Sequence, residues 1–418
     1  MYALIDGNCF FASCERVFRP DLWQRPVCIL SNNDGCVVAR SQEVKALGLK
    51  MGEPFYKVAP LCRRNGVAVF SSNYELYGDL SSRMMQTIAS LAPSIEIYSI
   101  DEAFADFTGI REPSVLGAQI KARVMQWVGI PTCVGIAPTK TLAKFTNHLA
   151  KKNPEFGGVC NWGEMENADR AAWMRASPVT ELWGIGRRLG ESLARQRVKT
   201  VFDFFHADPS TLRARYGVTL ERMLRELHGQ PCLSLEEVMP RQQILRSRSF
   251  SEEVTEKAEL RAAVSMHLSS AAHTLRAQGS AAGGVGVFIY SNRFRPDQPQ
   301  YLGWEIAPLP VPSCDTIALS EVAHRLLERI YRQGIGYKKA GVVLTDLSDS
   351  RHAQGDLLNE GDSERRLSLM KTLDQLHEKF GKNCVRSAVE FVGESWHMRR
   401  DRLSPCYTSR WSDLREVA

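Results

Sequence analysis

Several features are absent from this 418-residue sequence, and each absence excludes a class of protein. No uninterrupted apolar run approaches the roughly 20 residues that cross a bilayer, so we expect no membrane span. The eleven cysteines contain no C-x-x-C pair and the nine histidines are dispersed, which excludes a disulfide framework and a zinc site of the usual spacing. The first residues lack the basic end and long apolar stretch of a secretory signal, so we predict a cytoplasmic location.

The composition that is present is that of a globular protein with an uneven charge distribution. Hydrophobic residues make up 44% and charged residues 24% of the chain, and its length predicts roughly three domains. Residues 1–110 contain 12 acidic and 10 basic side chains, whereas the remainder contains 35 acidic and 43 basic ones. An acidic first part followed by basic parts fits metal chemistry in one region and polyanion binding elsewhere, although proteins that never bind nucleic acid show similar segregation.

Three carboxylates stand at the ends of apolar, strand-like runs, where carboxylates are rare. Asp6 ends the run Tyr2–Asp6, and Asp101 and Glu102 follow the run Ile95–Ile100. Burying an unpaired carboxylate costs several kcal/mol, so such positions favour a bound cation. Convergent oxygen ligands without nearby Cys or His suit Mg²⁺, and two such ions are the usual apparatus of nucleotidyl transfer. Taken alone, however, the adjacent pair fits a solvated hairpin better.

The periodicity of the chain predicts an α+β protein of several domains. Up to about residue 161, alternating strands and helices predict a sheet layer with helices on one side, and they place Asp101 and Glu102 in a hairpin between central strands. Residues 162–235 are wholly helical in pattern, and residues 243–348 predict a β-α-β-β-α-β module. The polar, aperiodic residues 349–365 predict a flexible linker before a last helix.

A glycine-rich turn within the helical region, residues 182–190, is typical of a helix–hairpin–helix. Gly184 and Gly186 open a helix that begins with Arg187 and Arg188. Exposed backbone N–H groups and the positive end of a helix can bind a DNA phosphate without reading sequence. Tight turns between helices need glycine in any case, so the motif alone leaves both interpretations open.

Five segments in order carry a resemblance to a known family: residues 6–15, 30–40, 71–77, 98–104 and 134–144. Together they resemble the Y-family translesion DNA polymerases, most closely the UmuC type, over essentially the whole chain. The resemblance implies error-prone DNA synthesis past lesions in the SOS response. It also implies an α+β multidomain right-hand fold, with a palm (1–19 and 74–161), small fingers (20–73), a helical thumb (162–235), a little finger (243–348) and a linker with a partner-binding region (349–418).

The resemblance also assigns roles to individual residues. It implies that two Mg²⁺ ions are held by Asp6, Asp101, Glu102 and the carbonyl of Gly7. Phe11 falls at the position that excludes a ribose 2′-hydroxyl, where UmuC-type relatives often have Tyr, although most apolar residues of a first helix are core residues. The nucleotide-binding set is completed by Phe10, Lys45 and Lys151, and the cover over the template base is formed by Gly35, Cys36 and Val37.

Contacts to DNA and to protein partners follow from the same resemblance. The candidate contacts to the DNA backbone in the little finger are Arg246, Arg248, Arg293 and Arg295, and at least one or two of them are expected to be merely solvated. Residues 354–358 resemble a sliding-clamp-binding pentapeptide, with Gln354, Asp356, Leu357 and Leu358 as its contact residues. The implied partners are primer–template DNA, a dNTP, the sliding clamp, a cleaved UmuD-type dimer and a RecA filament, with no membrane.

Two alternatives come from other functional classes. A nucleotidyl cyclase of the diguanylate type shares a paired-carboxylate hairpin, but it needs neither the glycine turn nor the basic module at 243–348. A non-catalytic DNA-binding scaffold needs no acidic trio.

Lys45 and Lys151, taken without the family, fit a solvated helix surface. Lys45 also stands where many family members carry Arg, and lysine lacks the bidentate geometry of arginine.

Overall fold

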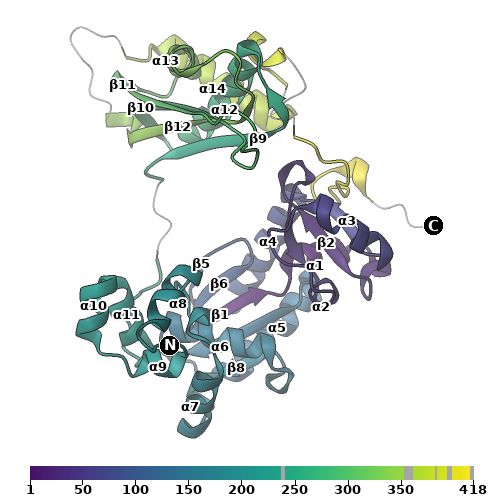
Figure 1. The fold of residues 1–418 in the computed structure, drawn as a ribbon, viewed down its shortest axis with the longest axis vertical. Coiled ribbons are helices and arrows are strands. Elements are labelled where there is room, and N and C mark those ends of the chain that lie inside the picture. The colour runs from purple at the N-terminus through teal and green to yellow at the C-terminus, as the bar shows by residue number, and fades with distance from the viewer. Residues whose placement is uncertain (237–240, 353–360, 382–383, 393–397, 415–418) are drawn as a thin grey trace. The chain divides into compact units, whose positions relative to one another are not determined.

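The computed structural model describes residues 1–236, 241–352, 361–381, 384–392 and 398–414. The chain forms two compact units, and it enters the second unit and then returns to the first (Figure 1). Unit 1 consists of Met1–Glu237 and Asp401–Ala418, and unit 2 of Val238–Arg400. Across the described ranges, no helix combines the length and apolarity needed to cross a bilayer.

A five-stranded sheet forms the centre of unit 1, in the order β5-β6-β1-β7-β8 (Figure 1). Its strands are β1 (Tyr2–Gly7), β5 (Ile95–Ile97), β6 (Glu102–Asp106), β7 (Thr132–Ala137) and β8 (Val159–Asn161). The central β1 pairs antiparallel with both β6 and β7. This order corrects one prediction, because β5 is an edge strand. The hairpin that carries Asp101 and Glu102 therefore joins an edge strand to an inner strand rather than two central strands.

Helices cover both faces of this sheet, so the prediction of helices on one side is wrong. Ala3 and Ile5 of β1 pack with α1, α4 and α5, whereas Leu4 points the other way and packs with α6. A strand buried on both faces is apolar at successive positions, as Ala3, Leu4 and Ile5 are, so this run was already a signal of a second covering layer. These helices are α1 (Phe10–Val17), α4 (Tyr74–Ala89), α5 (Pro113–Val128) and α6 (Lys140–Lys152).

A smaller three-stranded sheet, in the order β3-β2-β4, is formed by the chain between α1 and α4. Its elements are β2 (Val27–Leu30), β3 (Val37–Arg40), α2 (Gln42–Ala46), α3 (Phe55–Arg64) and β4 (Ala68–Ser71). The sequence pattern predicts a strand over residues 27–31 and a helix over residues 42–47, which are β2 and α2, but it predicts none of the other three elements. The strands β3 and β4 are four residues long, and α3 contains Pro60, a residue that usually breaks a helix.

Five α-helices follow between residues 167 and 227, which confirms the helical prediction for this region. They are α7 (Asn167–Ala176), α8 (Arg187–Ala194), α9 (Val201–Phe205), α10 (Pro209–Tyr216) and α11 (Val218–Leu227). Their apolar faces share one core with α6 and with the α6-covered face of the sheet. The last helix ends before residue 235 because Gly229, just after its end, adopts a left-handed backbone with a φ of +81°.

Unit 2 is built on a four-stranded antiparallel sheet in the order β11-β10-β12-β9. Its elements are β9 (Ile244–Val254), α12 (Lys257–Ala277), β10 (Ser280–Ser291), β11 (Leu302–Ser313), α13 (Thr316–Ile330) and β12 (Tyr337–Asp349). This order confirms the predicted β-α-β-β-α-β succession. Both helices pack on one face of the sheet around a single apolar core.

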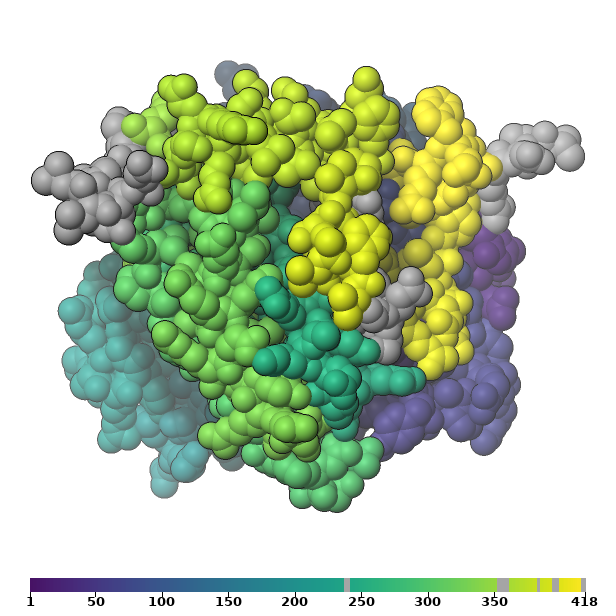
Figure 2. All heavy atoms as spheres, turned by 90° about the horizontal axis from the view of Figure 1, so that it is seen from above, coloured from purple at the N-terminus to yellow at the C-terminus, as the bar shows by residue number. Residues whose placement is uncertain are grey.

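The carboxy-terminal region, predicted as one region over 349–418, divides between the two units. α14 (Glu364–Phe380) and the short helix η7 (Ala388–Phe391) belong to unit 2, where Asp374 pairs with Arg276 of α12 at 2.7 Å. The C-terminal segment, Asp401–Leu414, packs on unit 1 instead (yellow against purple and blue in Figure 2). The predicted clamp-binding residues 354–358 lie outside the described residues.

Candidate active site

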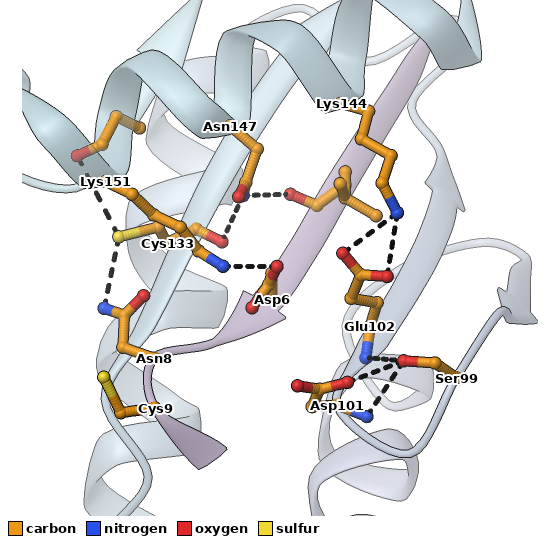
Figure 3. Close-up of polar contacts among 12 residues, drawn as sticks. Asp6, Asn8, Cys9, Ser99, Asp101, Glu102, Cys133, Lys144, Asn147 and Lys151 are labelled. Carbon is orange, nitrogen blue, oxygen red and sulfur yellow. Dashed lines mark hydrogen bonds and ion pairs between the residues drawn. The ribbon is translucent and has the colours of Figure 1, made fainter. Parts of the chain in front are cut away.

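The end of the β1–β6 pair brings the predicted acidic residues to one edge of the sheet. Asp6 and Glu102 are direct partners in the register of the two strands. The backbone N–H of Gly7 donates to the carbonyl oxygen of Asp101 at 2.8 Å. Asp6 and Glu102 both lie under α6 (Figure 3). Residues from the first strand and from a hairpin far along the chain are therefore neighbours here, as predicted.

Two lysines of α6 face these carboxylates. Lys151 forms an ion pair with Asp6, and Lys144 donates to both carboxylate oxygens of Glu102, at 2.9 and 3.0 Å (Figure 3). The two lysines are seven residues apart, which is about two helical turns, so they share one face of α6. Asp6 and Glu102 are thus each paired with a separate lysine of the helix above them.

Close packing of α6 on β7 fixes the position of these lysines. A Cβ atom at Gly135 would lie 2.1 Å from the backbone nitrogen of Asn147, so only glycine permits this approach. The side-chain amide of Asn147 then donates to the carbonyl oxygens of Leu4 and Cys133, at 3.1 and 2.8 Å. The helix is therefore bonded to both β1 and β7, and its lysines are held over the sheet edge.

Burial governs the electrostatics of Asp6. Removal from water raises the pKa of Asp6 to about 7, although the ammonium of Lys151 opposes this rise, and the neighbouring Glu102 adds to it. The ionised form of such a buried carboxyl group is strongly stabilised by a cation beside it. Over the described part of the chain, no three Asp, Glu, His or Cys side chains converge as a ready-made metal site. The acidic side chains at this edge offer only oxygen atoms as metal ligands, and oxygen ligands suit a hard divalent cation.

The turn between β5 and β6 holds Asp101 through one serine. The hydroxyl of Ser99 donates to the carboxylate of Asp101 at 2.7 Å (Figure 3). The same hydroxyl oxygen accepts from the backbone N–H groups of Asp101 and Glu102, at 3.2 and 3.1 Å. This serine therefore fixes the backbone of both acidic residues in a tight turn.

The two phenylalanines at the start of α1 have different surroundings. Phe10 is 3% exposed and its ring packs so closely on Gly7 that a Cβ there would lie 2.9 Å from it, so its side chain belongs to the core. Phe11 is half-buried and stacks on Tyr77 of α4, with ring centroids 4.6 Å apart and an angle of 19° between the rings. Tyr74 meets the same ring edge-on at 6.0 Å. Of the two phenylalanines, Phe11 is the one whose ring a ligand can reach.

The predicted contacts from residues 20–73 lie partly on the surface and partly in the core. Lys45 of α2 is exposed, and its ammonium group lies 3.4 Å from the sulfur of Cys9, the residue that precedes α1. Gly35 is exposed and Cys36 is half-buried. Val37 is fully buried in the core of the small sheet, so its side chain is not available to a base.

The glycine turn has the exposed geometry that its sequence predicted. Gly184 adopts a left-handed backbone with a φ of +93°, and Gly186 precedes the first residue of α8. Arg187 and Arg188 are both exposed at the start of this helix, and Arg187 pairs with Glu191 one turn later, at 2.9 Å. The element before the turn is the short 3-10 helix η5 (Val179–Glu181) rather than an α-helix.

Two of the four arginines predicted to contact DNA lie on the helix-covered face of unit 2. Arg246 donates to the hydroxyl of Thr274 in α12 at 2.8 Å, and burial lowers the pKa of Arg248. Arg246 and Arg248 lie at every second position between the buried residues Ile244 and Phe250 of β9, so all four side chains share one face of the strand. The other two candidates, exposed in the loop between β10 and β11, are Arg293 and Arg295.

Sequence reasoning missed two lysines of this site. Lys144 contacts Glu102, and Lys140 pairs with Glu96 of β5. The available signal was spacing, because positions 140, 144 and 151 fall on one face of a helix, but the resemblance drew attention to Lys151 alone. Three lysines of one helix thus face carboxylates on three neighbouring strands, β5, β6 and β1.

Comparison with known protein families and sequences gives matches along the whole chain. Residues 5–148 match the impB/mucB/samB family, residues 241–357 match the C-terminal domain of that family, and residues 368–417 match a domain of unknown function, DUF4113. Protein UmuC of Salmonella typhimurium is 43% identical and is covered over 100% of both chains, and Protein ImpB of the same organism is 42% identical over 99% of both. DNA polymerase IV of Caulobacter vibrioides is 28% identical over 92% of both.

Solved structures with the same fold are Y-family polymerases. A Y-family DNA polymerase chimera of Dbh and Dpo4 matches with a TM-score of 0.66 at 20% identity, covering 83% of this chain and 98% of that one. An insertion ternary complex of Dbh DNA polymerase matches with a TM-score of 0.56 at 19% identity, covering 82% and 98%. At these identities the likeness concerns the fold alone, and it confirms the predicted right-hand polymerase architecture. The chain therefore belongs to the impB/mucB/samB family, as a UmuC-type member of the Y-family DNA polymerases.

Proposed function

We propose that this polymerase carries out error-prone translesion synthesis, adding dNTPs to a primer 3′-hydroxyl opposite damaged template bases. The observation that carries the proposal is the pairing of Asp6 with Glu102 at a sheet edge lined by lysines of α6. Carboxylates at such an edge can hold divalent cations, and neighbouring lysines can receive the negative charge of a triphosphate. Membership of the UmuC type supports the same reaction.

The acidic residues would hold the metal ions, which we propose to be two Mg²⁺. The ligands would be Asp6, Asp101, Glu102 and the carbonyl of Gly7. When bound, the ions would lower the pKa of the primer hydroxyl and neutralise charge on the triphosphate and the leaving pyrophosphate. The raised pKa of Asp6 supports this assignment, because a desolvated carboxylate is stabilised by a cation close to it.

The start of α1 would contribute the nucleotide pocket. Phe11, backed by Tyr77, is a flat wall that leaves no volume for a 2′-hydroxyl and so selects deoxyribonucleotides. Lys45 lies beside the residue that precedes α1, where the first N–H groups of the helix suit phosphate. Lys151 would turn from Asp6 toward the triphosphate once a metal ion takes over the charge of that carboxylate.

DNA would be held mainly through its phosphates. The glycine turn with Arg187 and Arg188 suits sequence-independent contact to the backbone, while the small residues Gly35 and Cys36 leave room over the templating base. The binding of a sliding clamp through residues 354–358, of a cleaved UmuD-type dimer and of a RecA filament remains a prediction from the resemblance. The SOS response is likewise a prediction from the resemblance, and a cytoplasmic location is a prediction from the sequence.

Primer extension on an intact template and on a template with an abasic site tests this function. We expect extension past the lesion in Mg²⁺ and none after chelation. Asp101→Ala should abolish nucleotide addition while primer–template binding, measured by fluorescence anisotropy, is retained. Asp169→Ala, at an exposed acid of α7, is the matched control and should leave addition unchanged. Continued extension by the Asp101→Ala protein would refute the assignment of the acidic residues.

A further inference from the structure

The C-terminal segment, Asp401–Leu414, is docked on α1 and α4, the two helices that carry the stacked aromatic pair Phe11 and Tyr77. Its Tyr407 stacks on Phe18, the residue that follows the last residue of α1, with ring centroids 4.8 Å apart. Its Arg410 pairs with Glu75, in the first turn of α4, at 3.1 Å. The last part of the chain therefore joins α1 to α4 on the side of unit 1 where Phe11 and Tyr77 meet.

A buried hydrogen-bond network lies at the centre of this docking. The hydroxyl of Ser404 donates to Oε1 of Glu15 at 3.0 Å, and the hydroxyl of Tyr77 donates to the same oxygen at 2.6 Å. The side-chain amide of Asn73 donates to the hydroxyl and the carbonyl oxygen of Ser404, at 3.0 and 2.9 Å. Asn73 also caps α4, because its side-chain oxygen accepts from the N–H of Leu76.

The network is shielded from water, which makes its bonds stiff and costly to break. Glu15 and Tyr77 are 0% exposed, Asn73 is 1% exposed and Ser404 is 6% exposed. A buried polar group that loses its partner bears the full cost of its desolvation. Because Ser404 and Tyr77 share one oxygen of Glu15, a displacement of the C-terminal segment changes the bond that anchors the Tyr77 ring.

We propose that the C-terminal segment is a positioning element for sugar selection, in which Ser404 acts through Glu15 and Tyr77 to hold the ring of Phe11 in place. This inference rests on the proposed role of Phe11 as the wall against the 2′-hydroxyl. Ser404, Glu15 and Tyr77 are positioning residues, since Phe11 stands between them and the nucleotide. The segment falls within residues 368–417, which match a domain of unknown function, so the inference gives the last part of that domain a role.

Selectivity, rather than overall activity, is the quantity that such a support controls. A wall discriminates against one extra hydroxyl only if it does not yield when that hydroxyl approaches, and rigidity comes from the residues behind it. A deoxyribonucleotide has only a hydrogen atom where the ribonucleotide has the 2′-hydroxyl, so its use is much less sensitive to a less rigid position of the Phe11 ring. Partial unfolding lowers the use of both nucleotides equally and leaves their ratio unchanged. The ratio therefore separates positioning from general loss of structure.

The test uses full-length protein and measures kcat/KM for one ribonucleotide and its deoxyribonucleotide on the same primer–template. Ser404→Ala should raise ribonucleotide use about fivefold, with deoxyribonucleotide use within about twofold of the parent. Ser404→Thr keeps the hydroxyl and should restore the parental ratio. Ser412→Ala, the same change at an exposed serine of the segment, is the matched control. Tyr77→Phe keeps the stacked ring but loses the bond to Glu15, and it should act in the same direction as Ser404→Ala.

Phe11→Ala is the reference that separates this inference from the function on which it rests. If Phe11→Ala raises ribonucleotide use while Ser404→Ala and Tyr77→Phe do not, the support role is overturned and the sugar-selecting role of Phe11 stands. If Phe11→Ala leaves the ratio unchanged, the wall itself is wrongly assigned, and the inference falls with it. If the parent protein does not extend a primer at all, the proposed function fails. A raised ratio in all three variants, with the Ser412→Ala control unchanged, supports the inference.

Discussion

Replacing Glu15 by glutamine should change how the stability of unit 1 depends on pH. Glu15 is fully buried, and this burial raises its pKa to about 7, against the opposing effects of hydrogen bonds from Tyr77 and Ser404 and of the charge of Arg19. The folded protein therefore keeps a proton that the unfolded chain releases near pH 4.5. The stabilisation from this proton is fully present below that pH and is lost as the pH rises through about 7.

The size of the effect follows from the two pKa values. The difference between about 7 in the folded state and the ordinary value of 4.5 corresponds to about 3 kcal/mol. About 2.5 kcal/mol of this loss falls between pH 5 and pH 8. Glutamine does not ionise, so the Glu15→Gln protein should not show this loss of stability with rising pH. The second oxygen of Glu15 has no hydrogen-bond partner among the described residues, so the new amide adds a cost that is the same at every pH.

Hydrogen exchange of the α4 amides, compared between variant and parent at matched pH, is the suitable assay. A protein with two units need not unfold in one step, whereas exchange reports the opening of one region. The stability of Glu15→Gln relative to the parent should rise by about 2.5 kcal/mol from pH 5 to pH 8. Glu112→Gln, at an exposed glutamate, should stay within about 0.5 kcal/mol throughout. A difference between Glu15→Gln and parent that is constant with pH would refute the buried, protonated carboxyl group.

Two further predictions concern the support of the site and the DNA contact. Gly135→Ala should lower the free energy of unfolding, measured by thermal unfolding, by about 1–3 kcal/mol or more, because the added methyl group overlaps the backbone of α6. It should also weaken primer extension. Gly78→Ala, in α4 with open space around its Cβ, should be neutral or stabilising, by up to about 1 kcal/mol. Replacing Arg187 and Arg188 by alanine should weaken primer–template binding regardless of sequence and reduce the slope of log affinity against log salt by about two. An unchanged slope in fluorescence anisotropy would exclude both arginines from phosphate contact.

The acidic edge was predictable because its signal is local. Asp6, Asp101 and Glu102 each interrupt or end an apolar run. A carboxylate in that position is costly to bury unless a cation lies beside it, so the pattern indicates a cation-binding site. The pairing of β1 with β6 joins two strands whose middle residues are apolar and buried. Lys144 was missed because a lysine on a helix is usually a surface residue, and only the sheet below it gives this one a partner.

The docking of the C-terminal segment was beyond the reach of sequence reasoning. Ser404 and Glu15 are far apart in the chain, and no periodicity connects them. A single glutamate in an amphipathic helix predicts a solvent-exposed face, whereas Glu15 is fully buried. The short elements β3, β4 and α3 were missed for a different reason, because their fold depends on packing against each other rather than on local pattern.

The return of the chain to unit 1 has a consequence for the order in which the protein is made. β1, α1 and α4 leave the ribosome well before Ser404 and Tyr407, which follow the end of α4 by more than 300 residues. At about 5–20 residues per second, roughly 20 to 60 seconds separate the synthesis of Tyr77 from that of Ser404. During that interval the carboxyl group of Glu15 has no partner from the C-terminal segment. A chain released early would therefore carry the acidic edge and its lysines but not the completed support behind Phe11.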